Sequence, residues 1–89
     1  MRESAIQKKI QDKLREEGYF VFKTITCNIN GVPDIICCSP DGRFIGIEVK
    51  RPGQAATRLQ EYQMQRIRNN GGIAFVATSW QDVTAALNL

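Results

Sequence analysis

The fold of this 89-residue chain is decided by residues 31–50, which read GVPDIICCSPDGRFIGIEVK. Residues 33–38 have the composition of a short buried strand. The next four, Ser39-Pro40-Asp41-Gly42, predict a tight turn, because proline presets φ and glycine tolerates positive φ. Residues 43–50 then return as the second strand of a hairpin. Alternation along that strand puts Ile45, Ile47 and Val49 on one face and Phe44, Gly46, Glu48 and Lys50 on the other.

The predicted hairpin pairs two carboxylates. With the turn centred near Asp41, Asp34 and Glu48 lie opposite each other or within one residue of it, with Cβ atoms about 5 Å apart. Like charges in this position destabilise a sheet, and burial increases the cost. A divalent cation such as Mg²⁺ would offset that cost. Lys50 emerges on the same face, where it could hold a phosphate or an attacking water beside the metal.

A third carboxylate lies on the first predicted helix. Residues 3–17 form an amphipathic pattern with Ile6, Ile10 and Leu14 as its apolar stripe, and Gly18 is placed to end the helix. Glu3 falls in line with this stripe and points toward the sheet. It is therefore a candidate metal ligand. An acid in the first turn also favours the helix dipole, and the residue alone does not separate the two interpretations.

The rest of the chain supplies four further elements. Residues 19–26 and 73–78 are predicted strands, and residues 58–70 are a helix with Thr57 as its N-cap. A capping-box pattern over Ser79–Asp82 opens a last helix. The order is αβββαβα, so we expect one domain over residues 1–89, an α/β sandwich around a mixed four-stranded sheet. On the second helix we expect Leu59, Tyr62 and Ile67 in the core.

Composition excludes several reaction classes. The chain has no histidine, so a Ser-His-Asp triad and a histidine general base are impossible within it. Its three cysteines lack CxxC spacing, which disfavours zinc, and Cys37 and Cys38 are expected to be buried, inert thiols. The lack of a disulfide framework suits a reducing compartment, and no stretch resembles a leader or a membrane span. A net charge of +3 permits nucleic-acid binding without demanding it.

The motifs resemble those of a known nuclease group. Gly31-Val32-Pro33-Asp34 followed by Glu48-Val49-Lys50 resembles the GxPD…ExK signature of the PD-(D/E)xK nuclease superfamily. The continuation through Arg51-Pro52-Gly53, Thr57-x-x-Gln60 and Gly71-Gly72 resembles the VRR-NUC family, in its compact, stand-alone virus type.

That resemblance implies a restriction-endonuclease-like αβββαβα fold and a DNA endonuclease that depends on Mg²⁺, with Mn²⁺ as a substitute. It implies metal binding by Glu3, Asp34, Glu48 and the main-chain carbonyl of Val49, and catalysis by Asp34 and Glu48 supported by Lys50 and Gln60. Stand-alone members are similar to Holliday-junction resolvases, which implies a homodimer acting on branched or four-way-junction DNA. No membrane and no small-molecule cofactor is implied, and the expected location is the cytoplasm of a bacterium or a phage-infected host cell.

Several residues have competing interpretations. Gln60 is also the N3 residue of a capping box with Thr57, and Gln63, one turn on, is best explained by surface solvation. Candidate DNA contacts are Lys8, Lys9, Arg51 and Arg58, although the lysines equally suit a solvated helix face. Two other functions stay open: a DNA-binding or scaffolding module that has lost catalysis, and a structural dimer in which Asp34 and Glu48 are accidental neighbours.

Overall fold

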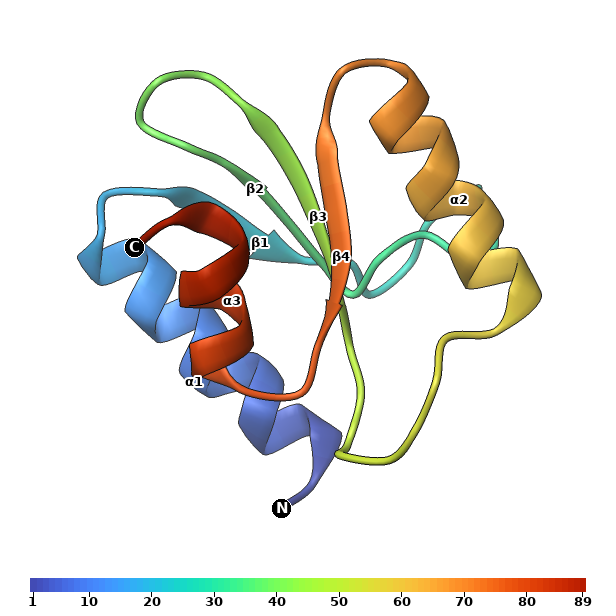
Figure 1. Cartoon of the computed structure of the whole chain (residues 1–89), viewed down its shortest axis with the longest axis horizontal. Coiled ribbons are helices and arrows are strands. Elements are labelled where there is room, and N and C mark those ends of the chain that lie inside the picture. Colours follow the sequence, from blue (N-terminus) through green and yellow to red (C-terminus); the bar gives the residue numbers. More distant parts are fainter.

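The computed structural model describes residues 1–89 as three helices and four strands in the predicted order (Figure 1). These elements are α1 (Glu3–Glu16), β1 (Phe20–Lys23), β2 (Ile35–Cys38), β3 (Phe44–Val49), α2 (Arg58–Asn69), β4 (Ile73–Ala77) and α3 (Trp80–Leu87). No helix has the length and apolar character to cross a membrane.

The sheet has the order β1-β2-β3-β4 and is mixed, as predicted. Strands β1, β2 and β3 are antiparallel neighbours, whereas β4 lies parallel to β3. In the hairpin, Ile35 pairs with Ile47 and Cys38 with Phe44, which confirms the predicted register. Gly42 closes the turn at φ +88°, and its N–H donates to Ser39 O.

Strand β1 is shorter than predicted. It ends at Lys23, and the next residue, Thr24, forms hydrogen bonds to the two residues that precede β2. The Thr24 N–H donates to Asp34 O at 2.8 Å, and its hydroxyl donates to Pro33 O at 2.8 Å. The β-forming residues that follow Lys23 therefore belong to a loop, and Ile25 is exposed.

Helices cover the two faces of the sheet unequally. Helices α1 and α3 lie together on one face, and α2 lies on the other (Figure 1). The main core, between the sheet and the α1/α3 pair, is built from Ile6, Ile10, Leu14, Val21, Ile35, Cys37, Ile45, Ile47, Val49, Ala77 and Val83. Helix α2 packs on β3 and β4, which leaves the same face of β1 and β2 without a helix above it.

The helix ends follow the predicted chemistry with one difference. Gly18, at φ +85°, follows α1, and Thr57 and Gln60 form the predicted capping box at the start of α2. At α3, Ser79 caps the Asp82 N–H. A capping box would also have the Asp82 carboxylate accept from the Ser79 N–H. It accepts instead from the N–H and the hydroxyl of Thr78, the residue before Ser79.

Two of the three core residues expected on α2 are wrong. Leu59 and Tyr62 are exposed, Ile67 is half-buried, and the buried side chain is Met64. Only a narrow stripe of α2 meets the sheet, because the helix packs mainly on β3 and β4. Leu59 instead covers Gly31, where an added Cβ would lie 2.6 Å from Leu59 Cγ.

Candidate metal site at the open end of the hairpin

Asp34 and Glu48 meet at the open end of the β2–β3 hairpin. Asp34 directly precedes β2, and continuing the register by one pair beyond Ile35 and Ile47 sets it opposite Glu48. The Asp34 carboxylate is oriented by the backbone of β3, since its Oδ2 accepts from the Val49 N–H at 2.9 Å. The two acids predicted from the hairpin register are therefore neighbours.

Glu48 is held in an unfavourable environment for a charge. Its side chain is only 2% exposed, and its Oε1 has no hydrogen-bond partner. Burial, and next the negative charge of Asp34, raise the pKa of Glu48 to about 8, while the Lys50 ammonium acts in the opposite direction. Lys50 Nζ lies 3.7 Å from Glu48 Oε2 and is itself largely buried. The single Lys50 ammonium therefore only partly offsets the cost of placing the charges of Asp34 and Glu48 side by side.

The chemistry of this donor set fits a hard divalent cation. Two carboxylates share a site, and one buried oxygen has no partner, which normally carries a free-energy cost. Mg²⁺ takes oxygen ligands from one or two carboxylates and retains other positions for water and phosphate. The N–H and C=O of one strand residue face the same neighbouring strand, so the Val49 carbonyl faces the side on which Asp34 lies.

Glu3 approaches this pair without completing a three-carboxylate cluster. Its charge contributes to the raised pKa of Glu48, after the larger effects of burial and Asp34. Its Oε2 lies 4.0 Å from Arg51 Nε, and the side chain is partly exposed. No three acidic, histidine or cysteine side chains stand close enough to form a ligand group in this arrangement. Glu3 therefore lies within electrostatic range of the pair and stays a predicted ligand.

Gln7 is a buried polar residue of α1 that sequence reasoning did not single out. It lies one helical turn after Glu3, is buried, and its Oε1 has no hydrogen-bond partner. Helix α1 contacts β3, the strand that carries the other unpartnered buried oxygen, at Glu48. The available signal was the i,i+4 spacing from Glu3, which places both side chains on one face of the helix.

The two glutamines of α2 have defined structural contacts. Gln60 Oε1 accepts from the Thr57 N–H at 2.8 Å, and no hydrogen bond uses its Nε2. Gln63 Nε2 donates to Asn30 O at 3.1 Å, and its Oε1 accepts from Arg66. Surface solvation was the wrong explanation for Gln63, because this side chain fastens the 28–31 loop to α2. The structure brings neither glutamine into hydrogen-bond contact with Asp34 or Glu48.

The predicted basic contacts divide into two groups. Arg51 is exposed and adjoins the site through Glu3. Lys8 and Lys9 lie on the exposed side of α1, where Lys8 pairs with Asp12 at 2.8 Å, and Arg58 is exposed at the start of α2. Only Arg51 is therefore placed beside the carboxylates by a contact in the structure.

The cysteines lie away from this chemistry. Cys37 is buried in the main core, where burial raises the pKa of its thiol to about 12, so it is protonated and unreactive at neutral pH. Cys38 is half-buried and Cys27 exposed. The prediction of two buried thiols is thus correct for Cys37 and only partly so for Cys38.

Comparisons with known proteins agree with the fold and the motifs. Residues 1–81 match the model of the VRR-NUC domain family. The chain is 31% identical over 87 residues to the protein named "Putative nuclease p44" of Acyrthosiphon pisum secondary endosymbiont phage 1, covering 98% of this chain and 92% of that protein. A solved structure named "VRR_NUC domain" superposes with a TM-score of 0.84 at 25% identity, covering 97% of this chain and 94% of its own. A second, named "VRR_NUC domain protein", gives 0.78 at 18% identity over 99% and 86%.

Proposed function

Because the chain belongs to the VRR-NUC domain family, we propose that it is a metal-dependent DNA endonuclease that hydrolyses phosphodiester bonds. The observation that carries this proposal is the environment of Glu48. Glu48 is 2% exposed, faces Asp34 and has an unpartnered oxygen, so its ionised form is costly unless a cation binds there. The 31% identical phage relative is named as a nuclease, which supports the same class of reaction.

The proposed ligands for Mg²⁺, or for Mn²⁺ in its place, are Asp34, Glu48 and the Val49 carbonyl, with Glu3 as a further ligand. When bound, the ion would acidify a water molecule and stabilise charge on the phosphate. The Val49 N–H keeps the Asp34 carboxylate turned toward β3. To bind the ion, the Glu3 side chain, in the first turn of α1, would have to turn away from Arg51 and toward Asp34 and Glu48.

Lys50 is the proposed group that holds the attacking water or the phosphate. Its ammonium lies 3.7 Å from Glu48 Oε2, so it is already at the carboxylates before DNA arrives. Gln60 has a free Nε2 while its Oε1 caps the helix, so it can donate to DNA without giving up the cap. The exposed Arg51, Arg58, Lys8 and Lys9 would supply sequence-independent affinity for the DNA backbone.

The proposed substrate is branched DNA, in particular a four-way junction, and the proposed active form is a homodimer in the cytoplasm of a bacterium or a phage-infected cell. Both follow from the resemblance to stand-alone, resolvase-like members. A junction has two-fold symmetry, so a two-fold dimer would present two active sites to two strands. Residues 1–89 would then form a single nuclease domain in each subunit.

The deciding experiment is a cleavage assay on supercoiled plasmid, linear duplex and four-way-junction DNA, with Mg²⁺, Mn²⁺ or chelator. We expect cleavage only with metal, and we expect Asp34→Asn and Lys50→Ala to abolish most of it. Asp12→Asn and Lys23→Ala are matched controls at exposed positions and should cut as well as the parent. Cleavage in chelator, or full activity of Asp34→Asn, would contradict the proposal.

The alternative of a DNA-binding module without catalysis gives a different result in the same assay. It predicts junction binding in a mobility-shift experiment, no cleavage with any metal, and no thermal stabilisation by Mn²⁺.

A further inference from the structure

An apolar surface lies on the α2 side of the sheet, where no helix covers it. Five side chains on three strands form this apolar face: Phe20, Phe22, Ile36, Cys38 and Phe44. Cross-strand pairs set them side by side, since Phe20 pairs with Cys38, Cys38 with Phe44, and Phe22 with Ile36. The rings of Phe20 and Phe22 meet edge to face with centroids 6.0 Å apart.

Three aromatic rings are exposed together on this face. Phe20 is 69% exposed, Phe44 51% and Phe22 45%. At about 200 Å² per phenylalanine, this amounts to roughly 300 Å² of aromatic surface in one strip. The largest apolar patch on a monomeric protein measures about 300–600 Å² and is often functional. An interface of standard size buries about 800 Å² per subunit, and in homodimers about 65% of that area is apolar. The rings alone supply more than half of that apolar share.

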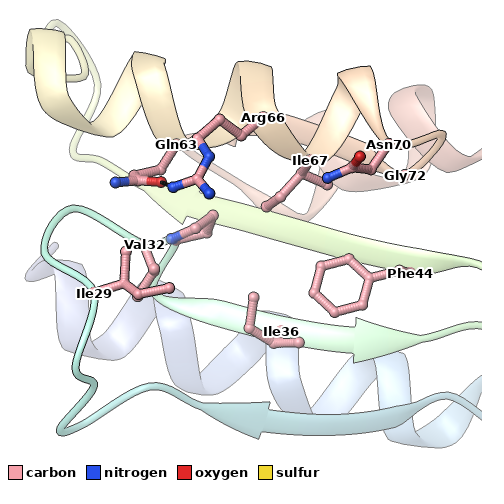
Figure 2. A pocket seen from close by; sticks show the side chains of 10 residues that line it. Ile29, Val32, Ile36, Phe44, Gln63, Arg66, Ile67, Asn70 and Gly72 are labelled. Carbon is pink, nitrogen blue, oxygen red and sulfur yellow. Dashed lines mark hydrogen bonds between the residues drawn. The ribbon is translucent and has the colours of Figure 1, made fainter.

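A pocket opens from the same face. It has a volume of about 390 Å³ and lies between the sheet and α2, as Figure 2 shows. Its floor is apolar, with Ile36 and Phe44 from the apolar face joined by Val32 and Pro33, and Ile67 of α2 faces them from the helix side. Its upper rim is polar and is formed by Gln63 and Arg66 of α2 and by Asn70, which directly follows the helix. An apolar centre with a polar rim is the usual construction of a protein–protein interface.

We propose that the apolar face is a two-fold interface with a second copy of this chain, in which Phe20 of each copy enters the pocket of the other. A two-fold contact uses one self-complementary surface, and this face carries both parts, a projecting ring and a pocket. Aromatic side chains in pockets are typical interface anchors. DNA is a poorer occupant, because the apolar face itself contains no lysine or arginine.

The position of the face suits the proposed function, on which this inference partly rests. Phe44 and Glu48 are at opposite ends of β3, about 13 Å apart along the strand. A partner seated on Phe20 and Phe44 would therefore leave the carboxylate end open to DNA. Pro33 lines the pocket and directly precedes Asp34, so the contact would also steady the loop that carries a proposed ligand.

Sedimentation equilibrium of the full chain tests the interface independently of nuclease activity. We expect the parent to be a dimer at micromolar concentration. Phe20→Glu should raise the dissociation constant by about 1000-fold, because each of two symmetric anchors contributes about 30-fold. Ala85→Glu, the same change on exposed α3 behind the sheet, should leave the dimer intact. A parent that is monomeric at 100-fold higher concentration (about 0.1 mM), or a Phe20→Glu dimer as tight as the parent, would overturn the proposal.

A second interface variant and a cleavage assay distinguish loss of the interface from misfolding and from loss of nuclease activity. Phe44→Lys reaches the same face from another strand and should also give monomers, which covers the case in which Phe20→Glu does not fold. Metal-dependent nicking of plasmid should persist in the folded monomers while paired cutting of a junction is lost. If the parent shows no nuclease activity at all, sedimentation still decides the interface. If Phe20→Glu weakens DNA binding while the parent is monomeric, the face binds DNA and the proposal is wrong.

Discussion

The Asp34 carboxylate accepts a 2.9 Å hydrogen bond from the backbone N–H of Val49, which follows Glu48 in β3. One strand thus orients the first acid and carries the second. The side-chain geometry of Asp34 is therefore tied to the sheet and not to a flexible loop, which is the arrangement that a preorganised cation site requires.

Asp34→Asn should raise the stability of the metal-free protein and remove its response to metal. Above about pH 8, where Glu48 is ionised, the amide oxygen can still accept from the Val49 N–H, whereas the repulsion between Asp34 and Glu48 is gone. We expect a gain of about 1 kcal/mol, which corresponds to a rise in Tm of about 4–8 °C for a chain of this size. Thermal unfolding with and without Mn²⁺ measures both effects. A variant that Mn²⁺ still stabilises as strongly as the parent would count against Asp34 as a ligand.

The stability of the metal-free protein should fall with rising pH. Burial and Asp34 raise the pKa of Glu48 from 4.5 to about 8, so the folded state holds a proton that the unfolded state releases. The stabilisation is complete below the unfolded pKa and is lost between about pH 4.5 and 8, with a slope of at most about 1.4 kcal/mol per pH unit. Urea unfolding across this range should show the decline, and Glu48→Gln should flatten it. Glu16→Gln, at an exposed position, should not.

Lys50→Ala should separate catalysis from metal binding. Removal of the ammonium takes away a charge aimed at the site, and we expect cleavage to fall by about 10²–10³-fold. Binding of Mn²⁺ should be retained, because the carboxylates are unchanged. Calorimetric titration with Mn²⁺ alongside single-turnover cleavage gives both quantities. Equal loss of metal affinity and rate would show that Lys50 acts through the carboxylates instead.

The two roles of Gln60 can be tested separately. Thr57→Ala removes the cap and should cost about 1 kcal/mol of stability without changing cleavage at low temperature. Gln60→Glu keeps an acceptor for the Thr57 N–H but loses the Nε2 donor, so cleavage should fall while Tm stays nearly constant. A Gln60→Glu enzyme with parental activity would leave Gln60 as a helix cap only.

Gly31→Ala should destabilise the protein more than Gly53→Ala. Both glycines have positive φ, +84° and +87°, and share the backbone cost of about 1–2 kcal/mol for an alanine there. At Gly31 the new Cβ would also lie 2.6 Å from Leu59 Cγ, whereas nothing stands near Gly53. Urea unfolding of the two variants gives the difference. A Gly53→Ala change as costly as Gly31→Ala would mean that Leu59 moves aside freely.

The hairpin and the pairing of Asp34 with Glu48 could be predicted because both depend on local rules. A Pro-Asp-Gly turn fixes the register, and period-two alternation fixes the faces. The exposure of Leu59 and Tyr62 could not be predicted, because periodicity marks an apolar stripe but not how much of it a partner surface covers. The proximity of Glu3 to Arg51 and the Asp34–Val49 hydrogen bond depend on how the end of β3 meets α1 and β2, which is set by tertiary packing.

Glu48 and Asp34 are proposed to hold one divalent cation between them. Diffraction from crystals soaked in Mn²⁺, with anomalous data, tests it most directly. We expect a peak within about 2 Å of Glu48 Oε1 and of an Asp34 carboxylate oxygen, with the Glu3 side chain turned away from Arg51 and toward this peak. No anomalous peak between these two carboxylates at saturating Mn²⁺ would contradict it.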